Sequence, residues 1–293
     1  MITYGRGSGR LPVAWSVTLW PATSVTWEMS HARGLRRLGG MRIAITGGTG
    51  TLGSLVAAEL TGRGNDVRVL SRSAPEYRVD LTTGAGLDRA LEGCDVVIDA
   101  SNNSSRHAAE ILVEGSRRLL AAEHTAGVSH HVCISIVGCE QVPMSYFQVK
   151  AEQERVTEQG PVPWSMVRAT QFHELALATL TAAARWGMPP VPRARLQTVA
   201  CAEVARVVAD VAEGTPQKER TEVAGPEVAD ARDLARAWRS VTGRRVALVP
   251  VPVPGKLGRA LRAGVLTTDR PDVRGTVTFT DWLAATDWLA ARQ

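Results

Sequence analysis

The sequence has few cysteines and no long apolar run, and each shortage excludes a class of protein. Its four cysteines, at positions 94, 133, 139 and 201, form no Cys-x-x-Cys pair, so we expect no zinc module. Three of them lie in apolar stretches, as buried free thiols do in a reducing compartment. A run of about 18 apolar residues, which a membrane-spanning helix needs, does not occur. We therefore expect a cytoplasmic protein with no membrane insertion.

Lysine is rare, so the positive charge of the chain comes almost entirely from arginine. The formal net charge of +5 at pH 7 raises nucleic acid or an acidic membrane surface as a possible partner. Residues 1–40 contain five arginines and one glutamate, which contribute +4 of this total and leave +1 for residues 41–293. Because the rest of the chain is nearly neutral, we predict no nucleic-acid partner.

The first forty residues differ from the rest in having no helical or strand period. The apolar patch at 11–20 is interrupted by hydroxyl residues and is followed by no small-residue cleavage site, so it matches a secretion signal poorly. We expect residues 1–40 to be a disordered extension or the product of a start codon assigned too early. Residues 41–293 are predicted to form one domain that begins directly with a strand.

A glycine-rich loop follows that strand. Residues 42–46 predict a short buried strand, residues 51–61 an apolar-periodic helix, and residues 67–70 a second strand. Glycines in the intervening loop permit a sharp turn, close approach to a pyrophosphate and close packing of the helix on the sheet, while the helix N-terminus attracts phosphate. The predicted cofactor-binding residues here are Gly47, Thr49, Gly50, Thr51, Leu52 and Gly53.

The end of the second strand indicates which dinucleotide fits. An acidic residue at this position would bind the ribose 2′-hydroxyl of NAD, but the sequence here is Ser71, Arg72, Ser73. Arg72 can form charge-assisted bonds to a 2′-phosphate, and the two serines can donate further bonds. The sequence therefore favours NADP(H) as the cofactor.

Further strands extend the sheet and bring more residues to the cofactor. Residues 77–81 and 95–100 predict the third and fourth strands, and residues 132–137 the fifth. Ligands of such sheets bind at the carboxyl ends of the strands, so polar and apolar residues there should contact the dinucleotide. The residues predicted to do so are Asp80, which is placed to contact adenine, and Leu81, Ala100, Ser101 and Asn102.

A tyrosine and a lysine four residues apart follow the fifth strand. Tyr146 and Lys150 share one face of a predicted helix over 146–158. Reduction of a carbonyl needs a proton donor, which tyrosine can be if a nearby cation lowers its pKa, and Lys150 supplies that charge. Ser135, at the end of the fifth strand, is placed to bond the substrate oxygen. The neighbouring pair His130 and His131 point to opposite faces of their strand, so we predict no metal site.

These motifs together resemble the short-chain dehydrogenase/reductase superfamily in its atypical, NmrA-like branch. The residues that carry the resemblance are 46–53, 71–73, 135–138, 146–150 and 167–172, and it extends over about residues 41–290. It implies a Rossmann α/β fold with a doubly wound parallel sheet, and reduction of carbonyls or related groups with NADP(H). The spacing of 11 residues between Ser135 and Tyr146 is a little shorter than is usual in that superfamily.

The last third of the chain predicts a small lobe on the substrate side of the sheet. We expect it to be built mainly from about residues 172–198 and 220–293, with an apolar pocket for a small-molecule substrate. Phe172 and His173 begin a helix at the sheet edge and are candidate substrate contacts, although a structural role for His173 remains open. Residues 187–198 predict an irregular crossover loop, and 197–200 a short strand at its end.

Three functions remain open from the sequence. The first is an NADPH-dependent oxidoreductase that transfers hydride to a small carbonyl, quinone or activated double bond, with Tyr146 as proton donor assisted by Lys150. The second is a non-catalytic NADP(H)-binding redox sensor or regulator of NmrA type, and the third a dinucleotide-binding structural subunit. Because both Tyr146 and Lys150 are present, the oxidoreductase is the preferred hypothesis. The sequence does not indicate an oligomeric state.

Overall fold

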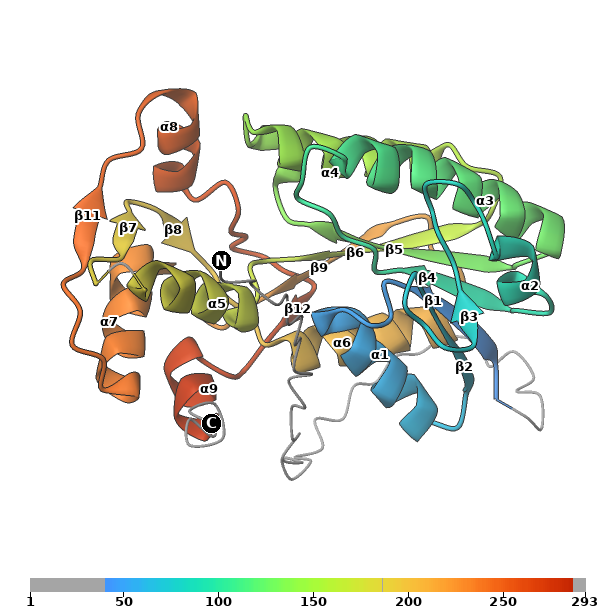
Figure 1. Ribbon diagram of the computed structural model, residues 1–293, viewed down its shortest axis with the longest axis horizontal. Helices are drawn as coiled ribbons and strands as arrows, with labels where there is room; N and C mark the ends of the chain where they lie inside the picture. The colour runs from blue at the N-terminus through green and yellow to red at the C-terminus, as the bar shows by residue number, and fades with distance from the viewer. Residues whose placement is uncertain (1–39, 186, 287–293) are drawn as a thin grey trace, which may run out of the picture. The chain divides into compact units, whose positions relative to one another are not determined.

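A central parallel sheet organises the chain, for which the computed structural model describes residues 40–185 and 187–286 (Figure 1). Its strands are β1 (Arg42–Thr46), β2 (Asp66–Ser71), β3 (Tyr77–Arg78), β4 (Val96–Asp99), β5 (His130–Ile136), β6 (Trp164–Ala169), β9 (Arg220–Ala224) and β12 (Val273–Arg274). They lie in the order β12-β9-β6-β5-β4-β1-β2-β3, and each neighbouring pair runs parallel. The predicted doubly wound parallel sheet is confirmed.

Helices cover both faces of this sheet, which explains why its central strands are apolar on both sides. One face carries α1 (Thr51–Gly62) and α6 (Cys201–Glu213) (Figure 1). The other face carries α2 (Leu87–Leu91), α3 (Gly115–Ala126) and α4 (Ser145–Glu158). A π-helical turn at Glu110–Glu114 leads into α3. Side chains of β1 alternate between them: Ile43 belongs to the apolar cluster that includes Leu60 of α1, whereas Ala44 belongs to the cluster that includes Leu119 of α3. Burying one such leucine contributes about 1.5–3 kcal/mol.

A second group of elements follows the sixth strand of the sheet. It comprises α5 (His173–Ala184), β7 (Pro190–Pro192), β8 (Arg195–Leu196), β10 (Ala229–Asp230), α7 (Ala231–Thr242), β11 (Val249–Val251), α8 (Gly255–Ala263) and α9 (Phe279–Ala285). We call this group, with its connecting segments, the C-terminal lobe. Its apolar cluster joins Leu177 of α5, Trp238 of α7 and Phe279 of α9. Among the described residues, no helix combines the length and apolar character needed to cross a membrane.

The structure corrects two expectations in this lobe. Residues 187–198 contain two short strands instead of an irregular loop: β7 pairs with β11, and β8 pairs with β10. Each partner lies far along the chain, so no local pattern announces the pairing. The predicted strand at 197–200 is wrong, because only Val199 forms a bridge, to Phe172. The extension predicted at residues 1–40 falls, up to residue 39, outside the described residues.

Candidate cofactor and active site

A pocket of about 850 Å³ opens at the carboxyl ends of the central strands. It lies where the chain order reverses, because β1 lies between β2, which follows it, and β4, which begins the other half of the sheet. Dinucleotides bind at such a point in doubly wound sheets. Eighteen sequence-predicted site residues line it: Gly47, Thr49, Gly50, Thr51, Leu52, Gly53, Ser71, Arg72, Ser73, Asp80, Leu81, Ala100, Ser101, Asn102, Ser135, Tyr146, Lys150 and Phe172.

The glycine loop has the geometry of a phosphate cradle. Gly47 has a φ of 66°, and a Cβ there would lie 2.5 Å from the carbonyl oxygen of Ala100. A Cβ on Gly53 would lie 2.3 Å from the carbonyl oxygen of Gly47, so only glycine permits this packing. Gly50 caps α1 without any side-chain hydrogen bond, which leaves the first N–H groups of the helix to a ligand.

A buried hydroxyl nearby also points to a ligand. The Oγ of Ser101 lines the pocket, is shielded from solvent and has no hydrogen-bond partner among the described residues. Leaving such a group unpaired costs about 1–3 kcal/mol, which a bound polar molecule would recover. Together with the glycine loop, this hydroxyl fits a dinucleotide in the pocket.

The side chain of Arg72 is available to bind an anion at the far end of the pocket. It is exposed and forms no hydrogen bond or ion pair with any described residue. The neighbouring Asp80 is held by its own turn, where its Oδ1 accepts bonds from the backbone N–H (2.9 Å) and Oγ1 (2.7 Å) of Thr82. These bonds, and more weakly the charge of Arg72, lower the pKa of Asp80. The carboxylate is therefore ionised beside an arginine whose donors remain free.

Tyr146 and Lys150 project from α4 into the same pocket. The hydroxyl of Tyr146 donates to Oδ1 of Asn102 at 2.9 Å, which joins two predicted site residues. Lys150 is buried, and its Nζ donates to the carbonyl oxygen of Ile134 (2.8 Å) and to Oε1 of Gln153 (2.6 Å). Burial raises the pKa of Tyr146, so the lowered pKa expected from the sequence is not found, and its hydroxyl is protonated at neutral pH.

A chain of buried polar groups fixes Lys150 and was not foreseen from the sequence. The Nε2 of Gln153 donates to Oδ2 of Asp99 at 3.0 Å, and Asp99 also accepts from Oγ1 of Thr46 at 2.7 Å. Burial opposes ionisation of Asp99. The positive charge of His131 and the hydrogen bonds that Asp99 accepts nevertheless lower the pKa of Asp99. The only sequence signal for Gln153 is that it lies three residues after Lys150, on the same helix face.

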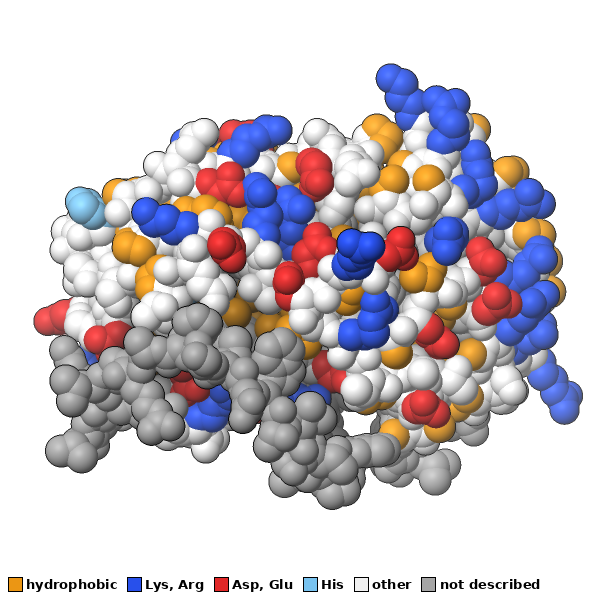
Figure 2. Space-filling view, turned by 180° about the vertical axis from the view of Figure 1, so that it is seen from behind, with side chains coloured by type: hydrophobic (Ala, Val, Ile, Leu, Met, Phe, Trp, Pro, Cys, Tyr) orange, Lys and Arg blue, Asp and Glu red, His pale blue; other side chains and the backbone are white. Residues whose placement is uncertain are grey.

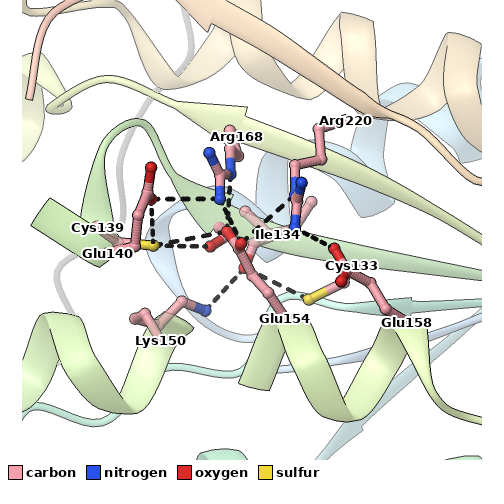
Figure 3. Close-up of polar contacts among 10 residues, drawn as sticks. Cys133, Ile134, Cys139, Glu140, Lys150, Glu154, Glu158, Arg168 and Arg220 are labelled. Carbon is pink, nitrogen blue, oxygen red and sulfur yellow. Dashed lines mark hydrogen bonds and ion pairs between the residues drawn. The ribbon is translucent and has the colours of Figure 1, made fainter. Parts of the chain in front are cut away.

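A buried ion pair lies behind this part of the pocket (Figure 3). The guanidinium of Arg168 on β6 donates through two nitrogens to the carboxylate of Glu154 on α4, with Nε to Oε1 at 2.9 Å. Cys139 lies 3.6 Å from the same carboxylate; burial first and then that negative charge raise the pKa of its thiol to about 12. The Oγ of Ser135 lies 4.0 Å from the sulfur of Cys139. The thiol is therefore protonated and unreactive.

The two predicted substrate contacts occupy different surroundings. Phe172 lines the pocket, whereas His173 is fully buried outside the lining, with its Nε2 3.0 Å from the carbonyl oxygen of Val277. The next residue, Glu174, does line the pocket and was missed from the sequence, because an acidic residue in a first helical turn is commonplace. Its oxygens accept from the N–H of Cys201 at 3.3 Å, and burial raises its pKa.

The adjacent histidines of β5 have separate partners. The Nε2 of His130 lies 2.9 Å from the hydroxyl of Ser165, and Nδ1 of His131 lies 2.9 Å from both oxygens of Glu123. Glu123 and His131 are both fully buried. Within the part of the chain that the structure describes, no group of three or more potential ligands converges on a metal position.

The buried Glu123–His131 pair predicts a particular pH dependence of stability. Burial opposes the charged form of His131, but the charge of Glu123 and hydrogen bonds raise its pKa well above 6.5. Above about pH 6.5 the unfolded chain releases this proton while the native state keeps it. The contribution of this pair to the free energy of unfolding therefore falls as pH rises, by up to about 1.4 kcal/mol per pH unit, until the native His131 titrates.

Urea denaturation of the wild type and of Glu123→Gln between pH 6 and 9 measures this slope. The glutamine keeps the shape of the side chain but removes the charge that holds the proton. We expect the variant to lose most of the decline above pH 6.5. Parallel curves for the two proteins would show that this pair does not bind the extra proton.

Solved structures with the same fold bind nicotinamide dinucleotides. An NADPH-dependent quinone oxidoreductase from Escherichia coli, solved with NADPH, matches with a TM-score of 0.70 and 19% identity, covering 83% of this chain and 98% of that one. A triphenylmethane reductase from Citrobacter sp., complexed with NADP(H), matches with a TM-score of 0.68, 18% identity and coverage of 83% and 100%. A UDP-glucose 4-epimerase from Thermus thermophilus, complexed with NAD, matches at 0.66, with 21% identity and coverage of 84% and 97%. These likenesses show that the chain has the Rossmann-like α/β fold of those proteins.

The sequence itself assigns the chain to a family. Residues 40–261 match the NmrA-like family, and the chain belongs to this family. The photosystem II assembly factor Ycf39 from Synechocystis is 28% identical over 147 residues. That match spans 45% of this chain and only 45% of the length of the relative.

Proposed function

We propose that this protein is an NADPH-dependent oxidoreductase that reduces a small carbonyl, quinone or activated double bond. The observation that carries the proposal is the position of the Tyr146 hydroxyl and the Lys150 ammonium in one pocket with the glycine loop and Arg72. The glycine loop and the N-terminus of α1 would hold the pyrophosphate, and Arg72 the 2′-phosphate. Bound NADPH would supply the hydride.

The residues of the chain supply the proton and the alignment. Because burial keeps Tyr146 protonated at neutral pH, its hydroxyl can donate a proton to the oxygen of a reduced carbonyl or quinone. Asn102 accepts the bond from this hydroxyl and orients it. Lys150, held by Ile134 and Gln153, stabilises the phenolate left after proton transfer and can use its remaining donor on the nicotinamide ribose.

The lining beyond the cofactor residues favours an apolar substrate. Ile111, Phe147, Phe172, Leu175 and Ala178 contribute apolar side chains to the pocket. Leu175 is 59% exposed, which places it at the rim. A flat aromatic molecule such as a quinone would bury its faces against these groups.

A second candidate function is that of an NADP(H)-binding redox sensor without turnover. The bonds of Lys150 favour it, because two of the three donors of its ammonium are taken by Ile134 and Gln153 and no hydrogen bond joins it to Tyr146. A sensor needs the same glycine loop and Arg72 but no proton donor. Turnover with an electron acceptor distinguishes the two functions.

Replacing Arg72 by glutamate is expected to change the cofactor preference. The substitution removes charge-assisted bonds to the 2′-phosphate and adds repulsion, so NADPH affinity should fall about 10- to 100-fold. NADH, which has no phosphate there, should bind within about threefold of the wild type. Titration of protein fluorescence with each nucleotide measures both affinities.

Arg89→Glu is the matched control for this experiment. Arg89 is an exposed arginine of α2 that is absent from the pocket lining, so the same charge reversal there should leave both affinities unchanged. An unaltered affinity of Arg72→Glu for NADPH would remove Arg72 from the binding site.

A further inference from the structure

Positive charge is concentrated in the C-terminal lobe. Residues 231–265 contain eight basic residues and one acidic residue, a local charge of +7. Because residues 41–293 together carry +1, the rest of that range carries −6. The near neutrality of the domain therefore conceals two parts of opposite charge. The basic residues are Arg232, Arg236, Arg239, Arg244, Arg245, Lys256, Arg259 and Arg262.

These side chains are exposed, and most of them have no acidic partner among the described residues. Arg236 alone forms an ion pair with another described residue, to Asp233 at 2.9 Å. Figure 2 shows blue side chains gathered along the right edge of the molecule, where the lobe lies when seen from behind. Lys256 lies in the first turn of α8, where the helix dipole disfavours a cation, so helix stability does not explain the charge.

Four of the arginines surround a shallow hollow of about 700 Å³ at the end of α7. Gly243, with a φ of 64°, ends the helix in the left-handed region and turns the chain back. This turn brings Arg244 and Arg245 to the same hollow as Arg236 and Arg239. The N–H donors of a guanidinium group are spaced so that one arginine can bind two oxygens of a phosphate group at once. A cluster of arginines is therefore suited to bind phosphate groups.

An apolar ribbon continues from this hollow. The backbone N–H of Val249 donates to the carbonyl oxygen of Pro189 at 3.1 Å, which holds β7 and β11 side by side. Met188 is 63% exposed and Val249 is 37% exposed beside it, two of the four exposed large apolar side chains among the described residues. Exposed prolines occupy the same two segments at positions 190, 192, 250 and 252.

We propose that this face of the lobe binds the surface of an anionic lipid bilayer. The arginines would contact lipid phosphates, while Met188 and Val249 would enter the boundary between headgroups and acyl chains. The apolar ribbon favours a bilayer over nucleic acid. Single-stranded nucleic acid is bound by stacking on exposed aromatic rings, whereas the four exposed large apolar residues among those described are methionine, leucine and valine.

Co-sedimentation of the full chain with vesicles tests the proposal. We expect binding to equal parts phosphatidylglycerol and phosphatidylcholine, weak binding to phosphatidylcholine alone, and loss of binding as salt rises. The double variant R244E/R245E should bind the anionic vesicles at least about thirtyfold more weakly, since each basic residue lost weakens binding about fivefold and the glutamates add repulsion. M188S/V249S should weaken binding without changing its dependence on salt.

The double variant R89E/R206E is the matched control, because it reverses the same number of charges at exposed arginines outside the lobe. If R244E/R245E unfolds at lower temperature than the wild type, K256E/R259E on α8 provides the same test. Equal vesicle binding by the wild type and the variants of the lobe would overturn the proposal. Failure to bind vesicles, with salt-sensitive binding of a DNA or RNA oligonucleotide that R244E/R245E abolishes, would overturn it in favour of nucleic acid.

Discussion

Replacing Tyr146 by phenylalanine is expected to remove turnover while leaving NADPH binding intact. The hydroxyl is the proton donor of the proposed reaction, and a general acid contributes about 10²- to 10⁴-fold to the rate. We therefore expect kcat/KM for a reducible quinone or aldehyde to fall by that factor. The NADPH affinity should stay within about threefold, because the ring remains and only the bond to Asn102 is lost.

Tyr77→Phe provides the control for this variant. Tyr77 lies on β3, outside the pocket lining, with the guanidinium of Arg68 4.9 Å from the centre of its ring. Loss of its hydroxyl should change neither turnover nor NADPH binding. Full activity of the Tyr146→Phe enzyme on a substrate that the wild type reduces would disprove the assigned role of Tyr146.

The largest effect on stability is expected at Arg168. Its replacement by methionine leaves the carboxylate of Glu154 buried with only the more distant guanidinium of Arg220, 3.6 Å away. Removing one partner of a buried ion pair costs about 3–5 kcal/mol. Urea denaturation of Arg168→Met should show a decrease of this size in the free energy of unfolding.

The double variant R168M/E154M distinguishes a lost ion pair from a poorly packed core. It removes both charges, so it should lose much less stability than Arg168→Met alone. If the double variant is as unstable as the single one, the cost lies in packing and not in the unpaired carboxylate. A loss below about 1 kcal/mol for the single variant would show that the pair contributes little.

Local patterns predicted those parts of the site that lie within one short stretch of the sequence. The glycine loop lies between a strand and a helix, and Tyr146 and Lys150 are four residues apart on one helix, so each group is brought together by its own element. The parallel sheet likewise followed from alternation of strand and helix patterns. All these predicted residues line one pocket because strand ends of a parallel sheet meet at one edge.

Contacts between distant segments were not predictable in this way. Gln153 orients Lys150 only because Asp99, 54 residues away, reaches it from β4. The strands β7 and β8 exist because β11 and β10 pair with them. The pKa of Tyr146 is raised because burial has the largest effect on it, and the depth of a side chain is set by the packed fold.

The distribution of charge within residues 41–293 was missed for a related reason. The net charge of a whole segment hides its distribution, and the near neutrality of residues 41–293 concealed a charge of +7 on residues 231–265. Arg236 and Arg239 of α7 surround one hollow with Arg244 and Arg245 because the chain turns back at Gly243. Such a surface follows from tertiary structure.

The most direct test of the central claim is to follow NADPH absorbance with the wild-type protein and a panel of quinones, aldehydes and enones. We predict that NADPH is oxidised in equal amount to the reduction of at least one acceptor, with an apolar quinone the fastest. The contrary result is binding of NADPH with no oxidation by any acceptor. That outcome would contradict an oxidoreductase and support a sensor of the cofactor.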